Sequence, residues 1–286
     1  MNILTEHLIF SSFVEWFDHT LLQEGRAFFN VTGGSLYSGI DPKLNLPTYS
    51  APYCQWVFDS SVSGAIVPTT GGWGVTHIDY INGRTISGSP TGSINYSVKD
   101  FNIYTSTSSD QKLIFEQKYY DRPKPNLRTA SGIPPYQVVA PCIFLVPDKM
   151  LSDEVQLGGG LIDKNIKISA IIVSDDEYKR FAVGSIFSDK KNTCFTYFDE
   201  TPLNRIGGLK TGGYNFTHQQ QRFNQQERIV YINKILYTPI EHDLITRNHP
   251  NLYFGKLYFD LSYYKGVNTV NSFGWSDDGG VWLEDL

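Results

Sequence analysis

Apolar side chains recur at intervals of three and four along the first 24 residues of the chain. At about 100° per residue they fall on one broad arc, as in an amphipathic helix. Gly25 follows the last of them, and Thr5 stands where an N-cap is favoured. The pattern predicts a helix over residues 3–24 that packs on a sheet through Ile9, Phe10, Phe13, Val14, Trp16, Phe17 and Leu21.

The opposite side of this helix is polar, but leucines interrupt it. Glu15, Asp18 and His19 lie on this side, and a solvated surface explains them better than a metal or catalytic site. The leucines leave two interpretations open. They are outliers on a helix that packs only on its own sheet, or they contact a neighbouring subunit; they are Leu4, Leu8 and Leu22.

Residues 78–86 (Ile-Asp-Tyr-Ile-Asn-Gly-Arg-Thr-Ile) carry the clearest β signal in the chain. Asn82 and Gly83 both accept positive φ, which predicts a two-residue type I′ turn between two strands. In that register Asp79 and Arg84 lie diagonally on one face, close enough for a weak ion pair.

The same style of short alternating runs, separated by Gly, Pro, Asn and Ser, continues along the chain. It predicts a mainly β fold, an antiparallel β-sandwich or barrel with the N-terminal helix and one mid-chain helix at 175–187. Irregular loops are predicted at 37–52 and 207–227. Further strands are predicted at 26–36, 53–58, 64–67, 94–105, 111–120, 138–146, 166–173, 194–198, 228–239 and 252–264.

Residues 121–136 are rich in Pro and Arg and predict an extended connector. On this interpretation residues 1–120 form an N-terminal helix with a β-rich part, and residues 137–286 form a second β-rich part with one helix. A single continuous domain is the alternative, because a chain of 286 residues can build one large core.

The charge distribution argues against a general electrostatic grip on nucleic acid. The net charge is −5, and the nearest approach to a basic cluster, residues 119–128, is spaced by prolines. No membrane association is expected either, because the longest apolar run, 138–146, is broken by Pro141 and is too short to span a bilayer.

The odd cysteine count and long spacings predict small buried thiols in a reducing compartment. The three are Cys54, Cys142 and Cys194, and no CxxC pair occurs. The first residues lack a cationic region and a secretory signal is not evident, so we expect synthesis and folding in a cytoplasm.

Motifs that would carry chemistry are missing from the sequence. Val183-Gly184-Ser185 begins like a nucleophile elbow, but Phe187 stands where the second glycine belongs. The glycine clusters never complete a phosphate-binding motif, and Glu241-His242-Asp243 fits a solvated turn better than a metal site. We therefore expect no enzyme, with no catalytic, cofactor-binding or metal-binding residue.

The stretch from Gly74 to Ile86 resembles a segment of virion structural proteins of tailed bacteriophages. Pro141-Cys-Ile-Phe-Leu, then Leu157-Gly-Gly-Gly and the strand at 166–173, are similar to the same class of protein. The resemblance covers about the middle third to half of the chain. It implies a non-enzymatic neck component that joins head to tail, of the adaptor, closure or tail-terminator type, which forms rings by repetition.

A ring subunit of this kind would bind copies of itself and other virion proteins (portal, neck or tail subunits). It would be made in the host cytoplasm and reside in the virion. Loops rich in Tyr and Pro and the stray helix leucines are the candidate contacts. The candidate interface residues are Leu4, Leu8, Leu22, Tyr49, Tyr53, Arg122 and Tyr136.

A carbohydrate-binding β module, such as a receptor-binding tail protein, is the alternative function. It rests on Trp73, Trp275 and Trp282, which stand beside Gly and Asp residues. Aromatic platforms with polar neighbours suit sugars, although tryptophans half-buried at strand ends give the same pattern.

Overall fold

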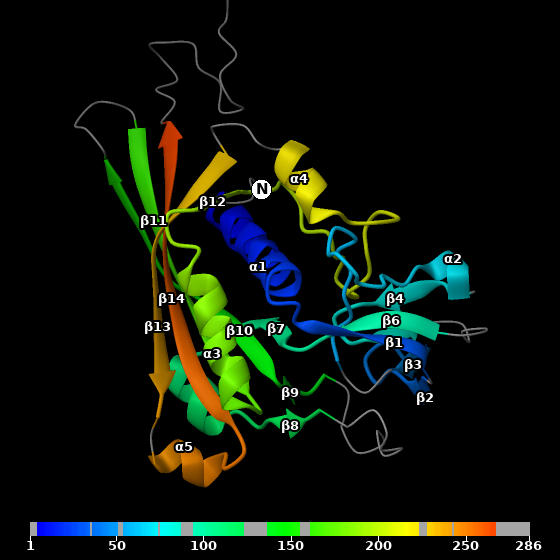
Figure 1. Cartoon of the computed structure of the whole chain (residues 1–286). Coiled ribbons are helices and arrows are strands. Elements are labelled where there is room, and N and C mark those ends of the chain that lie inside the picture. The colour runs from blue at the N-terminus through cyan, green and yellow to red at the C-terminus, as the bar shows by residue number, and fades with distance from the viewer. Residues whose placement is uncertain are drawn as a thin grey trace, which may run out of the picture.

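The computed structural model describes residues 5–34, 36–50, 54–73, 75–86, 94–122, 136–154, 161–222, 228–241 and 243–266. The fold is mainly β, with one long helix at the N-terminus and another in the middle of the chain (Figure 1). This confirms the fold class that the alternating sequence pattern predicts.

A six-stranded, strongly twisted sheet is the largest element of the fold (Figure 1). Its strands are antiparallel to their neighbours except for β7, which runs parallel to β10. In spatial order the strands are β12 (Cys194–Thr196), β13 (Ile229–Ile240), β14 (Tyr253–Gly266), β11 (Leu161–Ser174), β10 (Cys142–Glu154) and β7 (Asn102–Thr105).

Two helices cover one face of this sheet, α1 (Thr5–Gln23) and α3 (Glu177–Ser188). Their aromatic rings meet over the strands. Phe17 of α1 stacks on Phe187 of α3 with 4.0 Å between ring centroids, and it contacts Phe259 of β14 edge-on at 6.0 Å. Both predicted helices are therefore confirmed, and the arc of α1 packs on the sheet as expected.

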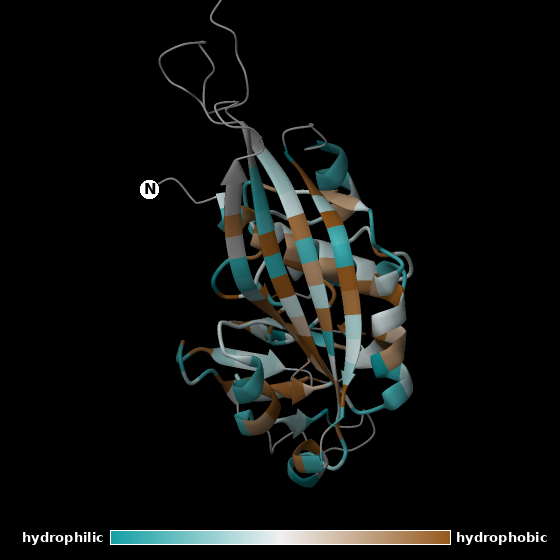
Figure 2. Ribbon diagram, turned by 90° about the vertical axis from the view of Figure 1, so that its left-hand side faces the viewer, coloured by the Kyte–Doolittle hydropathy of each residue, from teal (hydrophilic) through white to brown (hydrophobic). Residues whose placement is uncertain are grey.

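The opposite face of the sheet is covered at only one end. There η1 (Lys112–Glu116), a single π-helical turn, and α5 (Asp243–Asn248) pack on Phe144, Ile171 and Phe254. Toward the other end of the strands no described element covers the sheet, and Figure 2 shows them running in front of the helices. We call this part the open face: Lys149, Leu151, Lys167, Tyr231, Lys234, Leu236, Tyr258, Asp260 and Tyr264.

Smaller sheets and short helices complete the fold. A four-stranded sheet lies on the side of α1 that faces away from the large sheet (Figure 1). It has the order β2 (Tyr37–Ile40), β3 (Pro47–Ser50), β5 (Arg84–Ile86) and β4 (His77–Asp79). The remaining elements are the pair β1 (Phe28–Gly34) and β6 (Ile94–Lys99), the pair β8 (Tyr120–Asp121) and β9 (Val139–Ala140), and the helices α2 (Thr70–Trp73) and α4 (Phe216–Arg222).

The hydrophobic core crosses the predicted connector. One cluster of buried side chains joins Trp56, Ile78 and Tyr96 to Ile143 and Phe259 of the large sheet. The parallel pairing of β7 with β10 also links residues before and after 121–136. The α1 helix contributes to the same cluster, so it serves both parts of the chain.

The predicted turn of the 78–86 hairpin is wrong. Asp79 pairs directly with Arg84, so the connection has four residues instead of two. Gly83 has φ +59°, whereas Asn82 is not among the described residues with positive φ. The physical reason is the Asp79 carboxylate, which accepts hydrogen bonds from the Asn82 amide nitrogen at 3.1 Å and side chain at 2.7 Å.

Other local predictions are also wrong. Residues 37–52 contain the hairpin β2–β3. Residues 111–120 form η1 instead of a strand, because the adjacent Leu113 and Ile114 are both buried on one side, which a strand does not allow. The loop predicted at 207–227 contains α4, where the Asn215 side chain accepts the amide of His218 at 2.8 Å. Neither 53–58 nor 64–67 forms a named strand.

The cysteine prediction holds for two thiols of three. Cys54 and Cys142 are buried, but Cys194 is exposed because it lies on the edge strand β12 opposite the exposed Tyr231. In the described part of the chain, none of the helices has the length and apolar character needed to cross a bilayer.

The stacked pair Phe17–Phe187 should dominate the stability of the helix layer. Replacing Phe17, which is fully buried, with alanine should lower the free energy of unfolding by about 3–5 kcal/mol. Urea unfolding followed by circular dichroism measures this change. The control is Tyr178→Ala on α3, a side chain that is 86% exposed, which should change stability by less than about 0.5 kcal/mol. Equal losses in the two variants would contradict the packing described.

Candidate functional site

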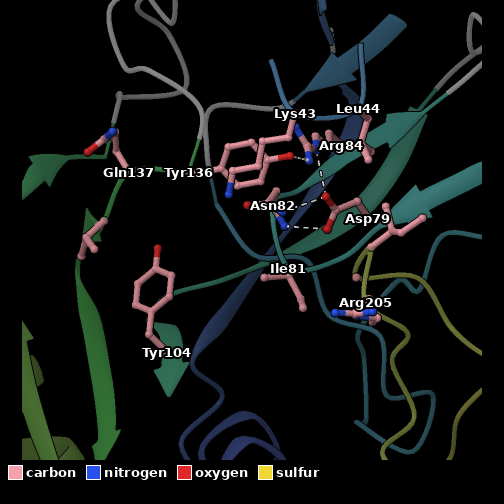
Figure 3. A pocket seen from close by; sticks show the side chains of 13 residues that line it. Lys43, Leu44, Asp79, Ile81, Asn82, Arg84, Tyr104, Tyr136, Gln137 and Arg205 are labelled. Carbon is pink, nitrogen blue, oxygen red and sulfur yellow. Dashed lines mark hydrogen bonds and ion pairs between the residues drawn. The ribbon is translucent and has the colours of Figure 1, made fainter. Parts of the chain in front are cut away.

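A pocket of about 490 Å³ lies between the four-stranded sheet and the segment that leads into β9 (Figure 3). This volume is in the range typical of ligand sites, roughly 300–1,000 Å³. Its walls come from strand ends and loops that lie far apart in the sequence. The lining residues include Lys43, Asp79, Arg84, Tyr104, Tyr136 and Arg205.

A buried ion network forms one wall of the pocket. Arg84 donates from Nη1 to Asp41 Oδ2 at 2.5 Å and from Nε to Asp79 Oδ2 at 2.8 Å. All three side chains are almost completely shielded from solvent. Desolvating these charges costs free energy, which charge-assisted hydrogen bonds offset only when every group is paired. Arg84 therefore acts as a structural cross-link, and its single Nε–H is used within the network.

Tyr136 closes this network on the pocket side. Its hydroxyl donates to Asp41 Oδ2 at 2.5 Å and accepts from Arg84 Nη2 at 2.9 Å. Its backbone has φ +65°, a left-handed conformation that costs free energy for a residue with a side chain. The Lys43 ammonium lies 3.7 Å from the centre of the Tyr136 ring, a cation–π contact. Tyr136 is thus held at its hydroxyl by the network and at its ring by Lys43.

Asp41 also shapes the turn between β2 and β3. Its Oδ1 atom accepts the backbone amides of Lys43 at 2.8 Å and Leu44 at 2.5 Å. Burial works to raise the pKa of Asp41, but the hydrogen bonds from Tyr136 and the two amides, with the charge of Arg84, lower it to about 2. The carboxylate is consequently ionised at neutral pH, as the network requires.

Two glycines allow the loops around the pocket to approach each other. Gly207 has φ +79°, and a Cβ atom there would lie 2.1 Å from Asp79 Oδ1. Its carbonyl accepts the amide of Tyr80 at 2.9 Å, which fixes the 205–207 loop against the hairpin. A Cβ at Gly83 would lie 1.9 Å from the carbonyl oxygen of Cys54. Neither position has room for a larger residue.

The polar groups that remain for a ligand are mostly donors. Arg205 makes no hydrogen bond or ion pair with any residue that the structure describes, and Lys43 contacts only the Tyr136 ring and its own backbone turn. Tyr104 projects into the open space (Figure 3). None of the described lining residues is Ser, Thr, Cys or His. The arrangement therefore suits the binding of an anionic group.

A second buried polar cluster lies under α1. Lys99 donates to Asp18 Oδ2 at 2.7 Å, and His19 Nδ1 lies 2.7 Å from Asp59 Oδ2. The prediction that Asp18 and His19 belong to a solvated helix surface is therefore wrong. The reason is that β6 and the loop at Asp59 pack on this side of α1, so both sides of the helix are covered.

This second cluster does not form a catalytic triad. The Ser61 hydroxyl donates to Asp59 Oδ1 at 2.6 Å instead of approaching His19, so nucleophile and base are not paired. Burial, followed by the charge of Asp18, raises the pKa of Glu15 to about 8. At neutral pH Glu15 is thus largely protonated, which limits the negative charge beside Asp18 and Asp59.

The predicted interface residues are widely scattered. Tyr136 lies in the pocket and Tyr49 is half-buried in β3, while Leu8 is half-buried on α1. Arg122 is half-buried and donates from Nη2 to the carbonyls of Lys99 at 2.6 Å and Asp100 at 2.9 Å, which ties β8 to β6. Leu4 and Tyr53 lie outside the described residues.

Leu22 is the predicted interface residue that the fold uses internally. Its side chain is 1% exposed and packs with Val57 and Val62 in a small separate core cluster. A leucine buried in this way cannot reach a neighbouring subunit, so its placement on an exposed side of the helix is corrected. The segment at 57–62 covers that side of α1, which the helical pattern alone could not show.

Sequence reasoning missed most of the pocket. The Asp41-Pro42 pair is a turn signal that could have indicated the role of Asp41, because aspartate side chains often bind backbone amides two or three residues on. Nothing in the sequence marks Lys43, Tyr104 or Arg205, which only the tertiary fold brings together. The Trp73 side chain, Trp275 and Trp282 lie outside the described part of the chain.

Loss of Arg84 should destabilise the protein strongly. Arg84→Leu leaves Asp41 and Asp79 buried without their partner, and we expect a loss of about 3–5 kcal/mol in unfolding free energy. Chemical denaturation measures it. Arg205→Leu, on an exposed and unpaired side chain of the same pocket, should cost less than about 0.5 kcal/mol. Similar values for the two variants would show that the network is not structural.

Glu15 should make stability fall as the pH rises. Its folded-state pKa of about 8 exceeds the ordinary 4.5, so the unfolded state releases this proton first. The stability from the protonated form is complete below about pH 4.5 and is lost as the pH rises to 8. Glu15→Gln should therefore gain about 3–4 kcal/mol over the parent chain between pH 5 and 8. A constant difference across these pH values, from denaturant titrations, would refute the shift.

No family model matches the chain, and no curated protein matches it with statistical significance.

Proposed function

We propose that this chain is a non-enzymatic structural subunit of a tailed-phage particle. In this proposal it forms a ring with its own copies at the neck or tail, and it contacts other virion proteins there. It would contribute shape and contact area to the particle and would catalyse no reaction. The observation that carries the proposal is the open face of the large sheet.

The open face displays apolar side chains where a monomeric sheet would normally be polar. Leu151, Tyr231, Leu236 and Tyr264 are 44%, 43%, 51% and 47% exposed. They surround a charged centre in which Lys167 stands directly opposite Asp260. Aromatic and aliphatic groups around a few charges are typical of interfaces between proteins. A second protein that covered this face would give the sheet a second layer, which the described residues do not supply there.

The free edges of the same sheet favour contact through the face over strand pairing. Among the described residues, β10 has no partner on its outer side beyond Leu145. Pro147 and Pro239 lie on the two opposite edges, and bulges occur beside Lys149 and Lys234. Proline, lysine and bulges are devices that oppose unspecific edge-to-edge pairing. The face is the less protected surface.

A ring requires contact between two different patches of the same chain. Such heterologous contacts close into a ring when the rotation between neighbours divides a full turn. The open face lies on the opposite side of the large sheet from α1 and α3, and the four-stranded sheet lies beyond α1 (Figure 1). In the proposed ring, a neighbour seated on the open face would present one of these other surfaces, as a closed ring needs.

Assembly should depend on the open face. We expect rings of uniform diameter in electron micrographs of the purified chain, and Tyr231→Glu with Leu236→Glu should abolish them, because two buried charges would remain unpaired. Tyr178→Glu, on the exposed side of α3, is the matched control and should leave rings intact.

Particles offer an independent test. Phage produced without this chain should yield heads and tails that fail to join, and added protein should restore joining. Infectious particles that form without the protein would refute the proposal. So would a chain that stays monomeric both alone and beside particles that lack it.

A further inference from the structure

We propose that the pocket binds the acidic, tryptophan-containing stretch 273–285 of a neighbouring copy. This inference rests on the proposed ring, because it needs a second copy within reach. The ligand chemistry is a peptide with carboxylate side chains next to an aromatic ring. Three features support it: the unpaired cations of the pocket, its apolar wall and the composition of the stretch.

Two of the three cations that line the pocket, Lys43 and Arg205, have no counter-ion among the described residues. Arg205 is exposed and unpaired among the described residues, and the Lys43 ammonium contacts only the Tyr136 ring. The network carboxylates, Asp41 and Asp79, are already bound to Arg84. Two cations at a concave site favour a ligand with at least two carboxylates, because the interaction of each pair is strengthened by the surrounding protein.

The rest of the pocket suits an aromatic side chain. Tyr104 and Tyr136 present their rings from opposite sides of the open space, and Ile81 lies between them (Figure 3). Ile81 and Ile206 are both about 41% exposed, an unusual state for isoleucine. A tryptophan ring against these groups would remove apolar surface from water and contact both phenol rings.

The end of the given sequence has the matching composition. From residue 267 onward it contains four carboxylate side chains and no Lys, Arg or His, so four of the five excess negative charges of the chain lie there. Trp275 stands two residues before the Asp277-Asp278 pair, and Trp282 stands two residues before Glu284-Asp285. Each half of the stretch therefore offers one large ring and two adjacent carboxylates.

The stretch is long enough to reach a neighbour. Twenty residues follow Gly266, the last residue of β14, and they can span at most about 70 Å when extended. The C-terminal end of β14 lies at the far end of the large sheet from β2 and β3 (Figure 1). The stretch thus starts at a distance from the four-stranded sheet of its own chain, and in the proposed ring it would enter the pocket of the next copy.

Carbodiimide cross-linking of the full-length chain tests the contact, because it joins a lysine only to a carboxylate that touches it. Lys43 should cross-link to Asp277, Asp278, Glu284 or Asp285, read by mass spectrometry. Mixing copies labelled with ¹⁵N and unlabelled copies distinguishes contacts between chains from contacts within one. Lys191, exposed beyond the end of α3, is the internal control and should give at least tenfold fewer such products.

Binding of a peptide provides the second measurement. The receptor is the full-length D277N/D278N/E284Q/D285N variant, whose own stretch no longer competes, and the probe is a labelled peptide of residues 271–286. Arg205→Ala with Lys43→Ala in this receptor should weaken binding at least tenfold. A probe with all four carboxylates changed to amides should bind equally weakly. Circular dichroism confirms that each receptor variant is folded.

The outcomes separate the two proposals. Cross-links from Lys43 between differently labelled copies support the inference. Cross-links confined to one chain overturn it, and so do cross-links that concentrate on Lys149, Lys167 or Lys234 of the open face. Equal binding of the probe to receptors with and without the pocket substitutions also overturns it. Rings without the Lys43 contact would leave the proposed function standing. Peptide binding by a chain that never forms rings would support the pocket chemistry and refute the ring.

Discussion

The guanidinium of Arg84 is the cross-link on which the four-stranded sheet and the pocket depend. It binds Asp41 from one hairpin and Asp79 from another, and Tyr136 from a third segment joins them. The outer strand β2 has little hydrophobic packing, since it is exposed along its whole length. The charged network instead specifies one arrangement, because any other would leave a buried charge without a partner.

Helix α1 plays the corresponding part for the large sheet. Phe13, Trp16 and Phe17 fill the space above the strands, while Asp18 and His19 on the other side hold β6 and the loop at Asp59. Helix α1 thus has aromatic side chains on the side of the large sheet and ionisable side chains on the opposite side. The packing of α1 sets the distance between the large sheet and the smaller ones. The pocket and the open face are therefore held at a fixed distance and orientation.

Sequence patterns predicted the elements whose apolar residues recur with a regular period. The apolar arc of α1 and the long alternation of β13 and β14 depend on local periodicity, and the structure confirms them. Prediction failed where a tertiary contact overrides the local preference. Asn82-Gly83 favours a tight turn, but the Asp79 side chain binds Asn82 and widens the connection. The run around Leu113 and Ile114 predicts a strand, but in the fold both side chains are buried on the same side of the segment.

The candidate site was still less accessible to sequence reasoning. Tyr136 was expected at an interface on the grounds of a Tyr- and Pro-rich loop, and it lies in the pocket. The partner Asp41 is 95 residues away, and Arg205 lies in a loop without any recognisable motif. Charge complementarity between such distant positions is a property of the folded chain, because no periodicity or spacing encodes it.

The wide sequence separation within the pocket has a consequence for the order of events in the cell. Its walls draw on residues from 43 to 207, so a growing polypeptide cannot form it until nearly three quarters of the chain has left the ribosome. Contacts that join distant residues form slowly and late. If the pocket is a docking point, then immature chains are unable to accept a neighbour. Completion of the fold would thereby serve as a checkpoint against premature polymerisation.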